Sequence, residues 1–466
     1  MKLYHYRSIE SALKEIQDGT FHFASREELN DPIEGYVRVY WQGDKAAWQG
    51  LLRNYVCSVL HSIYLYIAYG EKADLQFHLL MHDVHQDDDK PIGDSYRFVG
   101  DEFLRDNEID RITEFYGNNR LRVEKKELEF ILYFIHPKAC DLSLKRMRNM
   151  QCISEDVANE ILELHSHADV KFPYELVETV LKDELSRKQM TSHAMEAMED
   201  MLELKYIKYG LSTENFLIKN YEKGHEDTAY TEKKLERYWM LITVDLPKYY
   251  IEQLEHVLYP EAFVVCFSQK NDDSSMWGNY ADHHKGICLV YETNNDGTII
   301  VHGRRMEAKK IEYDGEIIER NFFETFGRLS NNQIITWLTG TNGLSDCMKA
   351  FSDVDSWKKT YWNVFETKYY KKLNAWKNEE EYRIIIDNTF GEYSDIQSRN
   401  LRYDIKALKG IIFGIKTSEF DKERIYNAIN RVMPLYGQIK FYQAEYDDEK
   451  QDIVVREKQL WNLKRS

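Results

Sequence analysis

The alternation of apolar and polar residues at the start of the chain predicts a strand, a helix and a second strand. Residues 2–7 alternate as in a half-buried strand. Ser8 is a suitable helix N-cap, the apolar residues at positions 9, 12, 13 and 16 form one helical face, and Asp18-Gly19 ends the helix. Residues 20–24 follow as a strand, and Asn30-Asp31-Pro32 turns the chain out of it.

Between about residues 40 and 250 the pattern is that of long amphipathic helices, expected at 47–69, 157–165, 175–188 and 195–209. Strand patterns resume afterwards, with a helical stretch at about 315–375 and a helix at 419–432; the strands are expected at 262–268, 286–292, 298–302, 306–313, 381–387, 410–415 and 439–445. We therefore expect an α+β fold. Residues 1–40 and 255–466 form one split, mixed-sheet domain, and residues 41–254 form a helical insertion.

Charge and cysteine content narrow the class of protein. The net charge of −17 disfavours non-specific binding to nucleic acid duplexes, because an acidic chain gains nothing from counterion release. The six cysteines form no CxxC pair, the start of the chain lacks the hydrophobic region of a signal peptide, and no run of about 18 apolar residues predicts a membrane span. These features predict a soluble protein of the reducing cytoplasm without membrane partners.

Common catalytic motifs are absent. The sequence has no GxGxxG, GxxxxGK[ST], GxSxG or HExxH pattern, so dinucleotide-fold dehydrogenases, P-loop ATPases, α/β-hydrolases and zinc peptidases have no motif support. Asp282-His283-His284 resembles the metal-binding signature of some phosphoesterases, but the further aspartates that hold two metal ions are missing. We therefore expect no metal site.

Two carboxylates near a late strand are the first candidates for chemistry. If the strand begins at Glu379, alternation places Glu379, Glu381 and Arg383 on one face. Two carboxylates about 7 Å apart can share a polyol such as ribose, one by hydrogen bonding and one by stabilising positive charge. Alternatively, this is a charged strand end that faces solvent, with Glu381 paired to Arg383 or to a lysine.

Two further groups of residues have both a functional and a structural interpretation. His5 and Arg7 share a face of the first strand, where they could bind a hydroxyl and a phosphate, or serve only in packing of an edge strand. Trp277 and Tyr280 are three residues apart on a short helix. They could stack on a planar ring to which Ser268 hydrogen-bonds, or both could pack into the core.

The order of these segments resembles a bacterial family known as domain of unknown function 2971. The resemblance covers roughly residues 1–35 and 262–445 and leaves out the helical block. It rests on Leu3–Ser8, Leu29–Glu34, Cys266–Ser268 with Met276, Trp277 and Tyr280, His284–Gly286, and Trp376 with Glu379, Glu381, Tyr382 and Arg383.

The layout is also similar to that of distant ADP-ribosyltransferases. This resemblance implies an ADP-ribosyltransferase-like mixed-sheet domain with NAD as its substrate. His5 or Arg7 would hold the ribose or phosphate of NAD, Ser25 or Ser268 would support the nicotinamide end, and Tyr280 or Trp277 would stack on the ring. Glu381 would stabilise the oxocarbenium-like transition state, and Glu379 would orient the acceptor.

Three hypotheses follow. The first is an NAD-dependent effector, such as a toxin or anti-phage protein, that modifies nucleic acid or protein and is restrained by a regulatory or antitoxin-like partner. The second is a non-catalytic module that binds a nucleotide or a partner. The third, a metal-dependent nuclease, lacks a complete ligand set. The transferase requires that His5, Tyr280 and Glu381 converge, and their placement on different faces would contradict it.

Overall fold

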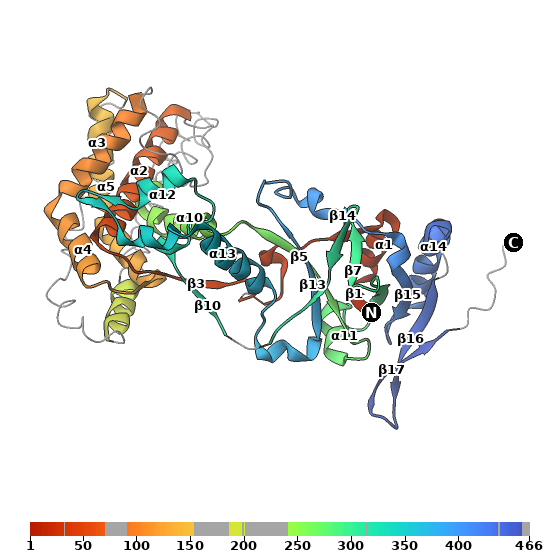
Figure 1. Cartoon of the computed structure of the whole chain (residues 1–466). Coiled ribbons are helices and arrows are strands. Elements are labelled where there is room, and N and C mark those ends of the chain that lie inside the picture. Colours follow the sequence, from red (N-terminus) through yellow and green to blue (C-terminus); the bar gives the residue numbers. More distant parts are fainter. Residues whose placement is uncertain are drawn as a thin grey trace, which may run out of the picture. The chain divides into compact units, whose positions relative to one another are not determined.

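The computed structural model describes residues 1–31, 33–69, 91–152, 186–197, 200, 241–313, 316–436 and 439–458 (Figure 1). It divides into two compact units. The first, here called the sheet unit, comprises Met1–Val37, Pro260–Ile318 and Trp362–Ser466. The second, the helical unit, comprises Arg38–Tyr259 and Glu319–Tyr361. Residues 319–361, expected in the split domain, thus group with the helices.

The sheet unit is built on one mixed sheet of eight strands. Neighbouring strands are antiparallel except for β15 and β16, which are parallel. The order across the sheet is β17 (Asp452–Glu457), β16 (Lys440–Asp447), β15 (Leu408–Phe413), β6 (Ile287–Glu292), β1 (Lys2–Arg7), β5 (Ala262–Ser268), β13 (Glu381–Asp387) and β9 (Lys309–Lys310). The N-terminal strand therefore lies in the middle of the sheet, between strands that follow it by more than 250 residues.

Helices cover both faces of this sheet. On one face, α1 (Ile9–Asp18) and α14 (Glu419–Tyr436) pack against Leu3 and the apolar residues of neighbouring strands (Figure 1). Ser8 caps α1 by accepting a hydrogen bond from the Ser11 N–H, and Gly19 ends it in the left-handed conformation. The short helix α11 (Ser274–Tyr280) packs through Trp277 against Tyr6 on the opposite face. Pairs of short strands flank the sheet: β2 (Thr20–His22) with β14 (Asn400–Arg402), and β7 (Thr298–Val301) with β8 (Arg304–Glu307).

The sheet is open between β1 and β5. β1 pairs with β6 along its whole length, but its pairing with β5 consists of Tyr4 opposite Ser268. At its other end β5 pairs instead with Ala24, whose N–H and carbonyl bond to Val264 at 2.8 and 2.9 Å. The strands thus separate over residues 265–267 of β5, and unpaired strand edges border the opening.

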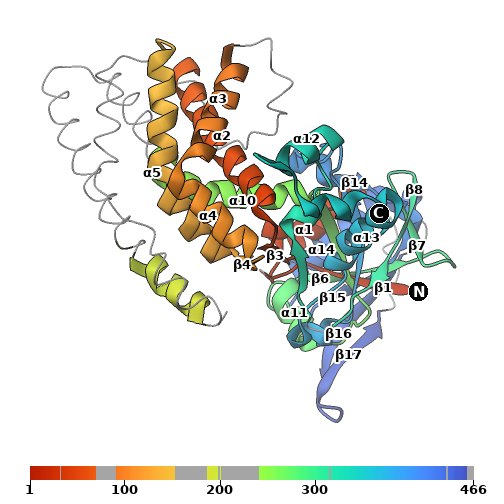
Figure 2. The same cartoon turned by 60° about the vertical axis from the view of Figure 1, so that its left-hand side comes forward.

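The described helical unit packs long helices around buried aromatic side chains. Its main helices are α2 (Lys45–Tyr69), α3 (Pro91–Arg105), α4 (Asn107–Asn118), α5 (Lys125–Asn149) and α10 (Leu246–Leu258) (Figure 2). The expected helix at 47–69 is part of α2. The helix expected at 157–165 and most of those expected at 175–188 and 195–209 lie outside the described residues, although residues 186–188 are helical. None of the described helices is both long and apolar enough to cross a membrane.

The prediction of a continuous helical stretch at about 315–375 is wrong in detail. This segment instead contains β10 (Ile318–Asn321), α12 (Asn331–Trp337), a two-stranded hairpin β11 (Thr339–Gly340) with β12 (Gly343–Leu344), and α13 (Val354–Tyr369). β10 pairs in a small sheet with β3 (Val37–Trp41), which also pairs with β4 (Val123–Glu124). Local signals break the helix: a capping box at Ser330 starts α12, and Gly343 has a positive φ in the hairpin.

Candidate functional site

A cavity of about 190 Å³ opens in the sheet unit where β1 and β5 separate. Six of the eight residues proposed from the sequence line it: His5, Arg7, Ser268, Tyr280, Glu379 and Glu381. Ser25 and Trp277 do not line it. The wall also includes Glu34, Cys266 and Lys372, to which the sequence analysis gave no role.

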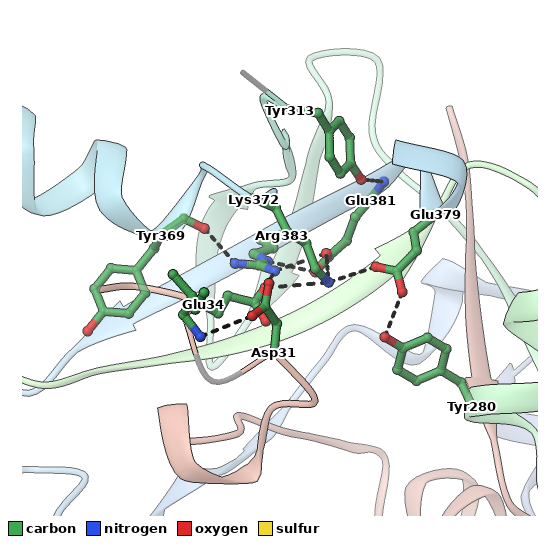
Figure 3. Close-up of polar contacts among 10 residues, drawn as sticks. Asp31, Glu34, Tyr280, Tyr313, Tyr369, Lys372, Glu379, Glu381 and Arg383 are labelled. Carbon is green, nitrogen blue, oxygen red and sulfur yellow. Dashed lines mark hydrogen bonds and ion pairs between the residues drawn. The ribbon is translucent and has the colours of Figure 1, made fainter. Parts of the chain in front are cut away.

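The two candidate carboxylates come from the junction of a short helix and a strand. Residues Asn374–Glu379 form a 3₁₀ helix, η6, and β13 begins at Glu381, not at Glu379 as the alternation argument assumed. Glu380 between them adopts a left-handed conformation with φ 42°. Both carboxylates nevertheless contact the ammonium of Lys372 (Figure 3). This shared ion pair, and not the alternation of side chains along one strand, brings them together.

Lys372 and Tyr280 hold Glu379. The Tyr280 hydroxyl donates to Glu379 Oε1 at 2.7 Å, and Lys372 Nζ donates to Glu379 Oε2 at 2.7 Å and to Glu381 Oε2 at 3.1 Å. The backbone of Lys372 is fixed in turn, because its N–H bonds to the Glu312 carbonyl at 3.0 Å. The cavity wall is therefore a preorganised chain of polar groups.

Arg383 occupies the other side of Glu381. Its Nε and Nη2 donate to the two carboxylate oxygens at 2.6 and 2.9 Å, and its Nη1 donates to the Tyr369 carbonyl at 2.7 Å (Figure 3). Arg383 Nη2 also forms an ion pair with Glu34, from the turn that follows Asp31. Two cations thus face three carboxylates, and the side chains of all five residues are at most 6% exposed. Buried charges of this kind persist because each is paired.

The protonation states follow from burial and from this pairing. Burial raises the pKa of Glu381, and the charge of Lys372 opposes this effect. Burial lowers the pKa of Lys372, but Glu381 and Glu379 outweigh it, so that its pKa lies above the ordinary value and the ammonium stays charged. Burial and the neighbouring Glu381 raise the pKa of Cys266. Its thiol is therefore protonated at neutral pH and is a poor nucleophile.

His5 and Arg7 form a second polar group with a buried carboxylate of α1. Glu15 Oε1 lies 3.0 Å from His5 Nδ1 and accepts from the Tyr291 hydroxyl at 2.6 Å, while Arg7 Nε donates to Glu15 Oε2 at 3.0 Å. Although burial raises the pKa of Glu15, its contacts with His5 and Arg7 and the hydrogen bond from Tyr291 lower the pKa to about 2. Glu15 is thus ionised, and it fixes the orientation of both first-strand candidates.

The side chains of His5 and Glu381 project from opposite faces of the sheet. Tyr4 and Glu381 both pair with Ser268 and therefore share a face, whereas His5 follows Tyr4 and points the other way. His5 and Glu381 nevertheless line one cavity, because the opening between β1 and β5 passes through the sheet. His5 and Glu381 thus lie on different faces of the sheet, the placement stated above to contradict the transferase, although both line the one cavity together with Tyr280.

The other candidates, Ser268, Ser25 and Trp277, make hydrogen bonds or packing contacts within the fold. The Ser268 hydroxyl donates to the Glu379 carbonyl at 2.7 Å and accepts from the Lys270 N–H, so it joins β5 to η6. Ser25 forms a capping box with Glu28 at the start of a 3₁₀ turn. Trp277 is fully buried, with its ring edge-on to Tyr6 at 5.0 Å and its indole N–H bonded to the Asn271 carbonyl. Of the two aromatic candidates, only Tyr280 faces the cavity.

The residues that the sequence analysis missed carried weak signals. Lys372 ends the basic segment 368–372, and a run of charged residues is usually a solvated surface, yet Lys372 is only 7% exposed. Glu34 belongs to the Leu29–Glu34 motif but had no assigned role. Within the described residues, no group of three or more His, Cys, Asp or Glu side chains is arranged to hold a metal ion. Asp282, His283 and His284 form a turn in which all three have positive φ.

Comparison with known proteins gives one match. Residues 276–384 match the family model described as "Protein of unknown function (DUF2971)". This segment includes Tyr280, Lys372, Glu379 and Glu381 but not β1, and it supports the family resemblance seen in the sequence. No curated protein and no solved structure matches the chain. The resemblance to ADP-ribosyltransferases therefore stays a prediction.

Proposed function

We propose that the sheet unit binds NAD in the cavity between β1 and β5 and transfers its ADP-ribosyl group to a macromolecular acceptor. The observation that carries this proposal is the shared lining of one cavity by His5, Arg7, Ser268, Tyr280, Glu379 and Glu381. The cavity is smaller than the roughly 300–1,000 Å³ of most ligand pockets. It suits the nicotinamide riboside end of NAD, with the remainder extending past Arg7.

The reaction would break the bond between the ribose C1′ and the nicotinamide nitrogen, with the electron pair leaving on nicotinamide. Glu381, held by Lys372 and Arg383, would stabilise the positive charge that develops at the ribose. Glu379 would orient the acceptor, whose nucleophile bonds to C1′ and releases its proton to solvent. Tyr280, fixed by Glu379, would contact the ring.

A second candidate, a non-catalytic nucleotide-binding module, is favoured by the state of Glu381. Both oxygens of this carboxylate already accept hydrogen bonds from Arg383, and one also accepts from Lys372. A carboxylate with this many cationic partners has less charge to offer a ligand than a free one. The opposite orientations of the His5 and Glu381 side chains also favour the non-catalytic binding module.

Release of nicotinamide from NAD by the full chain separates the two candidates. The Glu381→Gln variant is compared with Glu380→Gln, a matched change at the adjacent residue, which pairs with Lys270 outside the cavity. The transferase predicts release by the wild type and Glu380→Gln and a loss of at least 100-fold in Glu381→Gln, the usual cost of removing one such electrostatic group. Melting curves of all three verify folding.

No release by any of the three proteins, together with NAD binding in a titration, would select the binding module. No release and no NAD binding would overturn both candidates. As an effector, the intact chain would also arrest growth on expression, and Glu381→Gln would relieve the arrest. Growth arrest that persists in Glu381→Gln would contradict an effector that depends on this carboxylate.

A further inference from the structure

A second cavity, of about 250 Å³, lies beside the first in the sheet unit. Arg7 and His22 line both cavities, so the two share a wall. The other side chains of the second cavity include Lys14 and Glu15 from α1, Thr20 from β2 and Asn400 from β14. A ligand in the first cavity that extends past Arg7 would enter the second.

Cationic groups dominate the charge available in this second cavity. Lys14 is exposed on α1 and forms no ion pair within the described residues. Arg7 engages Glu15 through Nε and lines both cavities, and its two terminal nitrogens form no ion pair within the described residues. The charge of Glu15 is compensated by Arg7, and its carboxylate is also hydrogen-bonded to His5 and Tyr291, so Lys14 supplies the uncompensated charge. The charge that this cavity presents to a ligand is therefore positive, although the chain as a whole has a net charge of −17.

We infer that the second cavity binds phosphate, and that the ligand of the sheet unit carries a diphosphate that extends from the first cavity past Arg7 to Lys14. This inference rests on the proposed binding site and specifies its ligand as a nucleoside diphosphate or dinucleotide. Guanidinium and ammonium groups bind phosphate oxygens through charge-assisted hydrogen bonds, and the Thr20 hydroxyl supplies a neutral donor. Ser11 and Lys14 lie three residues apart on α1 and share its cavity-facing side.

Calorimetric titration of the full chain with pyrophosphate, ADP and nicotinamide riboside tests this inference. Lys14→Glu should weaken pyrophosphate and ADP binding at least tenfold, about the worth of one charge-assisted contact. It should leave the affinity for nicotinamide riboside, which has no phosphate, unchanged. The control is Lys2→Glu, the same change of charge at an exposed residue of β1 that lines neither cavity.

The outcomes separate this inference from the proposed function. If Lys14→Glu and Lys2→Glu weaken pyrophosphate and ADP binding equally, the effect is one of net charge and the phosphate site is overturned. Failure of the wild type to bind pyrophosphate or ADP would also overturn it. Nicotinamide release without pyrophosphate binding would overturn the phosphate site and keep the transferase. If Lys14→Glu alone loses pyrophosphate binding and the wild type releases no nicotinamide, the phosphate site is supported. The non-catalytic binding module is then the remaining candidate function.

Discussion

Lys372 holds together the acidic side chains of the cavity. Its ammonium contacts Glu379 at 2.7 Å, Glu381 at 3.1 Å and Glu34 at 3.6 Å, although the side chain is only 3% exposed. A lysine in this position is costly to bury and is retained only because carboxylates surround it. Its removal would leave those carboxylates with Arg383 as their remaining buried cation.

Lys372→Met should therefore destabilise the sheet unit by about 3–5 kcal/mol at pH 7, the usual effect of leaving buried charge uncompensated. Without the charge of Lys372 to oppose burial, the pKa of Glu381 rises further in the folded state, so the loss of stability should shrink as the pH falls and this carboxylate binds a proton. Denaturant unfolding at pH 7 and pH 5 measures both effects. Lys377→Met, at an exposed residue of η6, is the control. A deficit of equal size at both pH values would contradict this account.

Glu15 should make the sheet unit sensitive to acid. Its pKa falls from 4.5 to about 2 on folding, so the stabilisation it provides is present above pH 4.5 and is lost as the pH falls toward 2. Glu15→Gln should cost up to about 3 kcal/mol at neutral pH, from 1.36 kcal/mol per pKa unit, and progressively less below pH 4.5. Urea unfolding between pH 3 and pH 7 tests this.

The matched control is Glu10→Gln, on the same helix, because Glu10 is 76% exposed and pairs with Arg424 at the surface. It should leave the pH dependence nearly unchanged, as exposed ion pairs contribute little. Parallel pH profiles for the wild type and Glu15→Gln would show that Glu15 is not the group responsible.

On the side away from β5, β1 packs closely against the start of β6. Gly286, just before β6, lies so close to β1 that a Cβ there would be 2.2 Å from the Arg7 carbonyl oxygen. The Gly286 carbonyl also accepts from the Gly414 N–H and from the Thr417 hydroxyl. This glycine therefore fixes the end of β1 that carries Arg7.

Gly286→Ala should force β6 away from β1 and destabilise the unit by about 1–3 kcal/mol, as overpacking does elsewhere. Because Arg7 would shift, pyrophosphate binding should weaken as well. Thermal melting and titration measure the two effects. Gly278→Ala is the control: a Cβ there meets nothing within 4 Å, and alanine is the better helix former in α11. Equal melting temperatures for the two variants would contradict the close approach.

At the scale of the whole molecule, the two units are interleaved in the chain, and residues 319–361 complete the helical unit. Phe322 packs 5.7 Å from Trp41, and Phe323 packs edge-on to Trp48 at 5.6 Å. Phe322 also contacts Phe326 and Trp337. A deletion of residues 41–254 alone would therefore strip the partners from a cluster of large aromatic side chains.

We expect that deletion of 41–254 yields an aggregating protein that binds hydrophobic dyes, because it exposes this aromatic cluster. Removal of both segments of the helical unit, 38–259 and 319–361, with flexible linkers in their place, should leave a monomeric sheet unit that unfolds cooperatively. Size-exclusion chromatography, dye binding and near-ultraviolet circular dichroism compare the two. A well-folded 41–254 deletion would place residues 319–361 with the sheet unit instead.

Local signals in the sequence predicted several elements of the sheet unit correctly. Alternation predicted β1, apolar runs predicted β5 and β13, and the Ser8 cap and Gly19 predicted α1 nearly to the residue. Local pattern also marked Tyr280, Glu379 and Glu381, which line the cavity. It left open whether Trp277 contacts a ligand or packs in the core, because three-residue spacing shows that two side chains are neighbours but not which of them is buried.

The sequence by itself determined most of the central strands of the sheet unit, its helices α1 and α14, and the polar residue types at their ends, because periodicity, caps and turns act over a few residues. Only the tertiary structure decided that β1 separates from β5, that Lys372 joins Glu34, Glu379 and Glu381, and that residues 319–361 pack with the helices. These features depend on strand order and on the pairing of buried charges between segments far apart in the chain. Such pairings leave no periodic trace in a single sequence.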